Sequence, residues 1–423
     1  IFAVILMVSA LFLLLFKNES VLTSIRKNFF KATTVATGTT GTCNWTLDSD
    51  GLLLIEPTNG VSGTMGTYSY SSSFYTYGNQ ITSIRFNGTV YAPVNCERLF
   101  SYLFKLTSFD ASNFNTQNAM DMNRMFSECE MLTELDVSTF NTQNVTNMSS
   151  MFFYCTKLTG IDVSNFNTQN VTNLSGMFNN CQSITELDFS NFSTQNVTSL
   201  MNMFYNCQSI TELDLSSFNT QNVNNMDQMF RGCKELTKLD VSNFNTENVT
   251  DMGYMFKDCQ SLTELDISNF NMQNVLFTSK MMSDCIRLKS LSLGSNCIFA
   301  QKTNELSSYS TPWVKQGTIS PTYTSYELIS TYDGSTMAGT YVRINIIAVS
   351  LRKNGESWAD NGMKAALYQN GTEVYSYSQG EISQEDGTIT WYDVASGTYD
   401  IYASKDTNNI NTMVDTGEDV LAE

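Results

Sequence analysis

Acidic side chains recur at a fixed interval through the middle of the chain. Asp136, Asp162, Asp188, Asp214, Asp240 and Asp266 are each 26 residues apart, and Glu134, Glu186, Glu212 and Glu264 stand two residues before four of them. On strands stacked about 4.8 Å apart, like-charged neighbours would repel by about 1 kcal/mol in water and about 3 kcal/mol at an effective dielectric constant of 20. Some interaction must offset that repulsion.

Three hypotheses account for this acidic column. The first is local: each aspartate forms an Asx-type hydrogen bond to the backbone or to the serine two residues on, as Asp136 could with Ser138. The second is a calcium ion that bridges neighbouring carboxylates. The third is direct contact with a partner, which would make these aspartates and glutamates the candidate ligand-binding residues.

The composition narrows the classes of function. The 423 residues include 23 Lys and Arg, 41 Asp and Glu and no His, which gives a net charge of −18. That charge repels phosphate backbones and argues against nucleic-acid binding. The absence of His removes Ser-His and Cys-His nucleophile pairs and His-based zinc sites. Hydrolysis by a pair of carboxylates is the remaining catalytic alternative, but equivalent repeats give no pair with two unlike environments. We predict a protein without catalytic residues or a resident cofactor.

Other residue types keep the same 26-residue interval. The cysteine column is Cys129, Cys155, Cys181, Cys207, Cys233, Cys259 and Cys285, and the asparagine column includes Asn144, Asn170, Asn196, Asn222 and Asn248. A fixed period of this length predicts a solenoid, because one such unit cannot bury its own apolar face.

Each unit combines two periodicities. In VTNMSSMFFYC, Met148, Met151, Phe152 and Cys155 follow the spacing of one helix face, and in LTELDVSTF, Leu135 and Val137 share one face of a short strand. The sequence therefore predicts an α/β solenoid with one short parallel strand and one short helix per coil. Because helices need more room than strands, we expect the stack to curve, with the acidic column on its concave side.

The repeated columns have structural interpretations. The Met and Phe columns predict a core. The seven column cysteines cannot all pair, and successive helices would hold them too far apart to bridge, so we predict buried free thiols. Cys43, Cys96 and Cys297 could include one disulfide. The Asn column predicts a ladder of side-chain amides that satisfies backbone groups in the turns.

The flanking segments suggest an exported protein. Residues 1–17 begin with IFAVILMVSALFLLLF and predict a signal peptide or membrane anchor, which would be the only membrane contact. The basic stretch that normally precedes such an apolar segment is missing, so we expect a truncated N-terminus. We predict a linker at 18–42, a β-rich cap at 43–98 with a hairpin at Asp50–Gly51, the solenoid at 99–300 with seven repeats and a terminal coil, a linker at 301–340, and an all-β sandwich at 341–423.

The unit LTELDVSTFNTQNVTNMSSMFFYC resembles the 26-residue repeats of BspA-like bacterial surface proteins, a leucine-rich-repeat family, and GTCNWTLDSDG resembles their leader. The C-terminal part is similar to Cna-B or prealbumin-like stalk modules. This resemblance implies a cell-surface or secreted protein of a gut bacterium that binds an extracellular protein or glycan of the host or of neighbouring bacteria. The alternative is a purely structural stalk.

Overall fold

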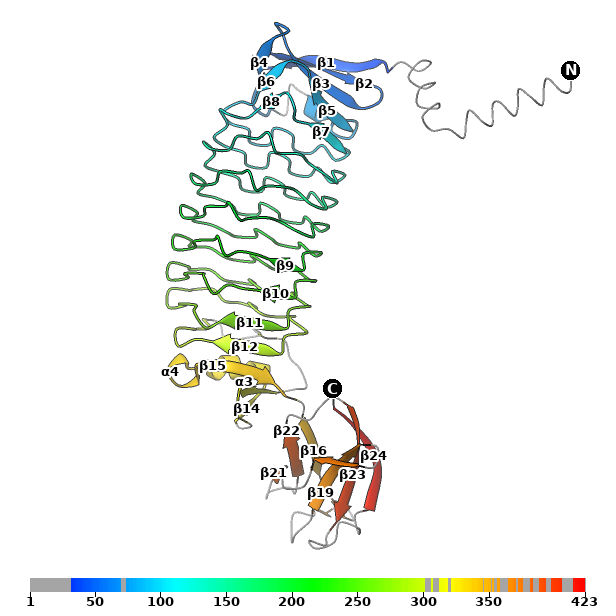
Figure 1. The fold of residues 1–423 in the computed structure, drawn as a ribbon, viewed down its shortest axis with the longest axis vertical. Coiled ribbons are helices and arrows are strands. Elements are labelled where there is room, and N and C mark those ends of the chain that lie inside the picture. The colour runs from blue at the N-terminus through cyan, green and yellow to red at the C-terminus, as the bar shows by residue number, and fades with distance from the viewer. Residues whose placement is uncertain are drawn as a thin grey trace, which may run out of the picture.

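A computed structural model describes residues 32–69, 74–300, 306, 312–318 and 321–344, and beyond them the strand backbones between 346 and 422. The repeats form a tall column of stacked coils, with one group of strands at its N-terminal end and further strands at its C-terminal end (Figure 1). The predicted solenoid is therefore present.

Successive coils run parallel and in register. One column of parallel bridges links Asn95, Asp121, Asn147, Asn173, Ser199, Asn225, Asp251 and Phe277. On another side of the coil, β9 (Glu212–Leu213) pairs with β10 (Lys238–Leu239), and β11 (Glu264–Ile267) pairs with β12 (Ser290–Leu293), both in parallel. The coils are therefore spaced like strands of a sheet, about 4.8 Å apart.

The helix predicted in each coil is wrong. Within residues 147–155, one set of backbone N–H groups donates to the next coil, and the other set closes turns to the residue three positions back. The donors to the next coil are Met148, Ser150, Phe152 and Tyr154, and those that close turns are Met151, Phe153 and Cys155. An α-helix bonds within itself, from each residue to the fourth residue before it. This segment is instead a series of turns bonded sideways into the stack, and the described coils are almost entirely β and turn.

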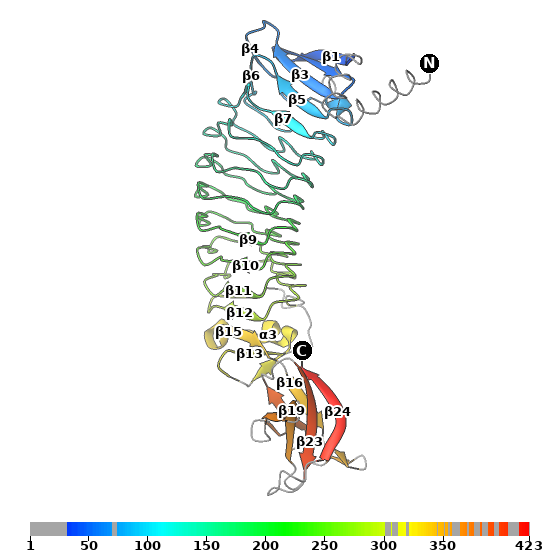
Figure 2. The same ribbon diagram turned by 45° about the vertical axis from the view of Figure 1, so that its right-hand side comes forward.

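The spacing that suggested a helix has another origin. Met148, Met151, Phe152 and Cys155 are indeed fully buried. Two successive turns of four residues bury the same positions as one helix face. Because both sides of a coil now advance at strand spacing, the physical reason for strong curvature disappears. Figure 2 shows a column that bends only gently.

Each coil turns through two residues in the left-handed backbone conformation, with φ between 54° and 77°. The first column is Arg98, Arg124, Ser150, Gly176, Asn202, Gln228, Tyr254 and Lys280, and the second is Tyr102, Glu128, Tyr154, Asn180, Asn206, Gly232, Asp258 and Asp284. Residues other than Gly and Asn adopt this conformation at a cost of roughly 1–2 kcal/mol. The inter-coil hydrogen bonds of the turns offset this strain.

The core consists of stacked side-chain columns, as predicted. One column is formed by Phe100, Phe126, Phe152, Phe178, Phe204, Phe230 and Phe256, whose ring centroids lie 5.5–6.2 Å apart in near-parallel planes. On the strand side, Leu135 and Val137 are buried and Asp136 between them is exposed. The predicted division of that segment into an inner and an outer face is confirmed.

The N-terminal cap is a sheet of order β1-β2-β3-β5-β7. Its strands are β1 (Thr34–Thr40), β2 (Cys43–Asp48), β3 (Leu52–Pro57), β5 (Ser83–Phe86) and β7 (Ser108–Asp110). A second sheet contains β4 (Ser62–Thr64), β6 (Thr89–Tyr91) and β8 (Phe114–Asn115). The 3-10 helix η1 (Phe74–Tyr77) lies between β4 and β5 in the chain. The hairpin expected at Asp50–Gly51 is present between β2 and β3. The segment expected as a linker contributes β1, which pairs with β2.

A second cap covers the other end of the solenoid, where the sequence predicted a linker at 301–340. β12 pairs with β15 (Gly339–Arg343), which in turn pairs with β13 (Trp313–Lys315) and, through it, with β14 (Thr322–Tyr323). Helices α3 (Ser325–Thr331) and α4 (Gly334–Met337) follow β14. Trp313 and Tyr341 are buried there, so this stretch has the core that a linker lacks, and the linker prediction does not hold for its described residues.

The C-terminal strands are antiparallel. One sheet has the order β16 (Ile346–Ser350), β22 (Thr388–Tyr392) and β21 (Glu381–Ile382). Another has the order β20 (Thr372–Tyr375), β19 (Lys364–Gln369), β23 (Gly397–Ser404) and β24 (Val414–Ala422). A separate hairpin consists of β17 (Arg352–Lys353) and β18 (Glu356–Ser357). The sandwich arrangement of these sheets stays a prediction. In the part of the chain that the structure describes, no helix is long and apolar enough to cross a membrane, and the predicted segment 1–17 lies outside that part.

Candidate functional site

The acidic column lies on the surface of the solenoid. We call it the acidic face: it comprises Asp110, Asp136, Asp162, Asp188, Asp214, Asp240 and Asp266 with Glu134, Glu186, Glu212 and Glu264, all exposed. In every coil the aspartate Oδ1 accepts the backbone N–H of the serine two residues on, at 2.8–3.2 Å. The predicted Asx-type bond is confirmed, and it holds each carboxylate in the same orientation.

These hydrogen bonds lower the pKa of the aspartates. The serine hydroxyl and then the serine N–H hold the pKa below its ordinary value in Asp110, Asp136, Asp162, Asp214 and Asp240, whereas in Asp188 the N–H contributes most. Repulsion from neighbouring carboxylates raises the pKa of Asp136, Asp188 and Asp240, but by less. These six aspartates therefore stay ionised at neutral pH.

An open groove of about 750 Å³ crosses three coils of the acidic face. Its lining is Glu134, Leu135, Asp136, Gly160, Ile161, Asp162, Ser164, Glu186, Leu187 and Asp188. Gly160 takes the position that Glu134 and Glu186 occupy in the adjacent coils, and no atom lies within 4 Å of where its Cβ would be. The missing side chain opens the groove between the two glutamates. Sequence reasoning overlooked Gly160, although the break in the acidic column was visible.

The groove gathers half of the predicted site residues. Glu134, Asp136, Asp162, Glu186 and Asp188 line it. The other predicted residues continue along the same column outside the groove: Asp214, Asp240, Asp266, Glu212 and Glu264. Among the described residues no group of three or more His, Cys, Asp or Glu side chains could hold a metal ion. Bound calcium stays a hypothesis.

A buried threonine column, which sequence reasoning missed, ties the coils together. Thr116, Thr142, Thr168, Thr194, Thr220 and Thr246 are at most 2 % exposed. Thr168 donates its hydroxyl to the carbonyl of Ser193 in the next coil at 3.1 Å and accepts the N–H of Ser193 at 2.8 Å. The signal available was the Thr of FNTQN, unchanged at 26-residue steps from Thr116 to Thr246.

All ten cysteines are free and buried. In the column, each Sγ–H donates to a phenylalanine carbonyl of the preceding coil at 3.0–3.3 Å, and burial raises the pKa of the thiols. The prediction of buried free thiols is confirmed, although no helix separates them. The suggested bond among Cys43, Cys96 and Cys297 is wrong, because Cys43 lies in the N-terminal sheet, Cys96 at the first coil and Cys297 at the far end.

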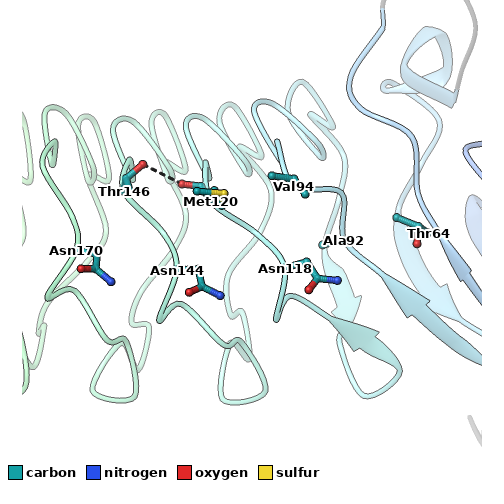
Figure 3. Close-up of a pocket in the computed structure, with 8 residues that line it drawn as sticks. All are labelled: Thr64, Ala92, Val94, Asn118, Met120, Asn144, Thr146 and Asn170. Carbon is teal, nitrogen blue, oxygen red and sulfur yellow. Dashed lines mark hydrogen bonds between the residues drawn. The ribbon is translucent and has the colours of Figure 1, made fainter.

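The asparagine column forms the predicted ladder. Asn144, Asn170, Asn196, Asn222 and Asn248 donate Nδ2–H to a backbone carbonyl of the preceding coil at 2.7–3.2 Å. These side chains are exposed rather than buried. At the N-terminal end the ladder borders a second groove of about 540 Å³, which we call the amide groove (Figure 3). Its lining is Thr64, Ala92, Val94, Asn118, Met120, Asn144, Thr146 and Asn170.

The fold and its surface define a parallel solenoid of 26-residue coils that exposes a regular array of side chains. Residues 94–213 and 198–296 match the model of a family described as "Mycoplasma protein of unknown function, DUF285". The matched residues lie in the repeats.

Other comparisons add little to this match. Among the curated proteins none matches the chain. Among solved structures, the chain is similar to a leucine-rich repeat protein from Eubacterium ventriosum, with 14% sequence identity over 62% of this chain and 85% of that chain, at a TM-score of 0.29. The resemblance to BspA-like proteins and to Cna-B modules stays a prediction.

Proposed function

We propose that this chain belongs to an exported surface protein whose solenoid binds a basic extracellular protein through the acidic face, without catalysis. The observation that carries the proposal is a file of exposed carboxylates in which Lys238, opposite Glu212 in the pairing of β10 with β9, is the single basic side chain. Among the described residues, Asp110 alone of the seven aspartates lies within 4 Å of a basic group, Arg85 at 3.8 Å. A partner with Lys or Arg side chains would supply the missing positive charge.

The spacing of the carboxylates favours an extended contact. Identical groups about 4.8 Å apart offer many equivalent weak contacts, and a multivalent partner gains avidity from engaging several at once. Coulomb attraction over the face would also accelerate encounter with a basic partner. The Asx bonds hold the carboxylates in place before binding, so little side-chain entropy is lost when the partner arrives.

Two alternatives give different expectations. A structural stalk needs the coils but not their charges, so neutralising the acidic face would leave attachment unchanged. A glycosidase needs one carboxyl with a raised pKa beside one that stays ionised. The aspartates of the face instead share one environment, and every resolved pKa shift among them is downward. The repeats therefore favour binding over hydrolysis.

Export rests on the sequence. The apolar residues 1–16 and the low content of charged residues, 15%, suit a protein of the cell surface. Attachment of that surface to host matrix or mucus, or to neighbouring bacteria, is the role that the resemblance to BspA-like proteins supports.

The test is retention of matrix and mucus proteins on the immobilised chain, in calcium and in chelator, at low and high salt. We expect retention of basic proteins that falls steeply between about 0.05 and 0.5 M salt, because the Debye length shrinks from roughly 14 Å to roughly 4 Å over that range. Loss of retention in chelator would assign calcium to the contact. Absence of retention under all four conditions would contradict the proposal and favour the stalk.

A further inference from the structure

The amide groove shares no residue with the acidic face, and its chemistry is different. None of its eight lining residues is charged, although the chain carries a net charge of −18. The side chains of Asn118, Asn144 and Asn170 lie in a row along one side of it (Figure 3). Its volume of about 540 Å³ falls within the range of about 300–1,000 Å³ that is typical of small-ligand sites.

The row of amides has unused hydrogen-bonding capacity. Asn144 and Asn170 each donate one Nδ2–H to the preceding coil, and no described group donates to their Oδ1 atoms. The side chain of Asn118 makes no hydrogen bond within the described residues, and the coil before it is shorter there, since Tyr91 pairs with Asn115 at a step of 24 residues instead of 26. The groove therefore offers one complete amide and two further amide oxygens at the coil spacing.

Apolar side chains complete the groove at the same place. Met120 and Val94 are 49% and 55% exposed. They stand in the column that carries Thr146 in the next coil. Leu276 is a further exposed apolar residue of this column, but Asn274 beside it donates to the preceding coil. Within the described residues, an amide without a hydrogen bond and exposed apolar groups therefore occur together only at the first coils.

A ligand for this groove must be neutral, rich in hydrogen-bonding groups and partly apolar. An extended peptide along the column would repeat its groups on one side every roughly 6.7 Å, out of step with amides about 4.8 Å apart. Neutral sugar rings combine hydroxyl groups with C–H faces. We propose that the amide groove binds a neutral polysaccharide, with Asn118, Asn144 and Asn170 bonded to sugar hydroxyls and Met120 and Val94 against the ring faces.

The test is calorimetric titration of the full chain with neutral six-unit oligosaccharides of glucose, mannose and N-acetylglucosamine, and with a uronic-acid oligosaccharide as the charged comparison. Asn118→Ala removes the amide that has no partner in the protein, and Met120→Thr installs the residue that the same column carries at position 146. Neither change removes an internal hydrogen bond, so both variants should keep the melting temperature of the parent chain. Asn248→Ala is the matched control from the same ladder outside the groove.

We expect at least one neutral oligosaccharide to bind. Asn118→Ala and Met120→Thr should each weaken that binding about five-fold, since one hydrogen bond or one apolar contact is worth about 1 kcal/mol, and Asn248→Ala should not change it. The proposal is overturned if no neutral oligosaccharide binds, if only the charged one binds, or if both groove variants bind as well as the parent. Because the acidic face is intact in all of these variants, its own binding is scored separately.

Discussion

The buried threonine column makes a strong prediction about stability. Replacing Thr168 with Val keeps the shape of the side chain but removes the hydroxyl that bonds both the N–H and the carbonyl of Ser193. Thr168 is 1% exposed, so water cannot take its place at these groups without opening the coil. Leaving each backbone group unpaired costs about 1–3 kcal/mol.

Two such groups sum to about 2–6 kcal/mol, and the more apolar side chain offsets part of this cost, so the expected loss in the free energy of unfolding is about 2–5 kcal/mol. At about 2–4 °C per kcal/mol for a domain of this size, the melting temperature should fall by roughly 4–20 °C. The damage lies in the middle of a stack whose coils depend on their neighbours, so urea unfolding should lose its single sharp transition or shift as a whole.

The control is Thr172→Val in the same coil. Thr172 is exposed and donates only to the carbonyl of Thr146, at 3.1 Å. Water can replace that bond, and the cost should stay within about 0.5 kcal/mol. Equal losses in the two variants, or no loss in Thr168→Val, would refute the assignment of the buried column as the tie between coils.

Two further predictions follow from the pKa values. All ten thiols are buried and free, and burial raises their pKa, for instance to about 12 for Cys155 and Cys233. An alkylating reagent at pH 8 should therefore modify almost none of them in the native chain and all ten after denaturation. Substantial labelling of the native chain would contradict the packing. The lowered pKa values of Asp136 and Asp162 mean that the folded state stabilises the ionised form of these two side chains. Their contribution to stability is therefore full above the ordinary Asp pKa of about 3.9 and is lost as the pH falls through the lowered values. Melting temperatures measured from pH 7 to pH 2 should therefore hold to about pH 4 and then fall, less so when these two residues are Asn, and an equal fall in that variant would contradict the reasoning.

Much of the fold was predictable because the repeat is regular. The 26-residue columns identified a solenoid, the residues of its core and the outward carboxylates, and the structure places Leu135, Val137 and Asp136 as expected. The Asx bonds were predictable from the serine two residues after each aspartate. These features depend on local chemistry that a sequence shows directly.

The helix was mispredicted because periodicity does not record where a backbone N–H group bonds. Turns of four residues and a helix bury the same positions, and only the acceptor differs: the next coil in one case and the same segment in the other. Gly176 and Gly232, which break the column of side chains at left-handed positions, were the available hint. The two grooves were harder to predict from the sequence, because each depends on departures from the repeat at single positions. In the groove of the acidic face, Gly160 replaces a glutamate, and in the amide groove, Met120 stands where the next coil has Thr146.

The central claim is that the acidic face binds through its charges, and one set of variants tests it directly. Asp162, Asp188 and Asp214 are changed together to Asn, which removes three charges but keeps the Oδ1 that accepts the serine N–H. A second chain carries Ala at these positions, which removes the charges and the hydrogen bonds.

Binding of basic matrix protein and the melting temperature are then measured for both chains. The account predicts that the Asn chain loses little of its melting temperature and most of its binding, whereas the Ala chain loses much of both. Full binding by the Asn chain would show that the carboxylates serve only to hold the turns, and it would contradict the account.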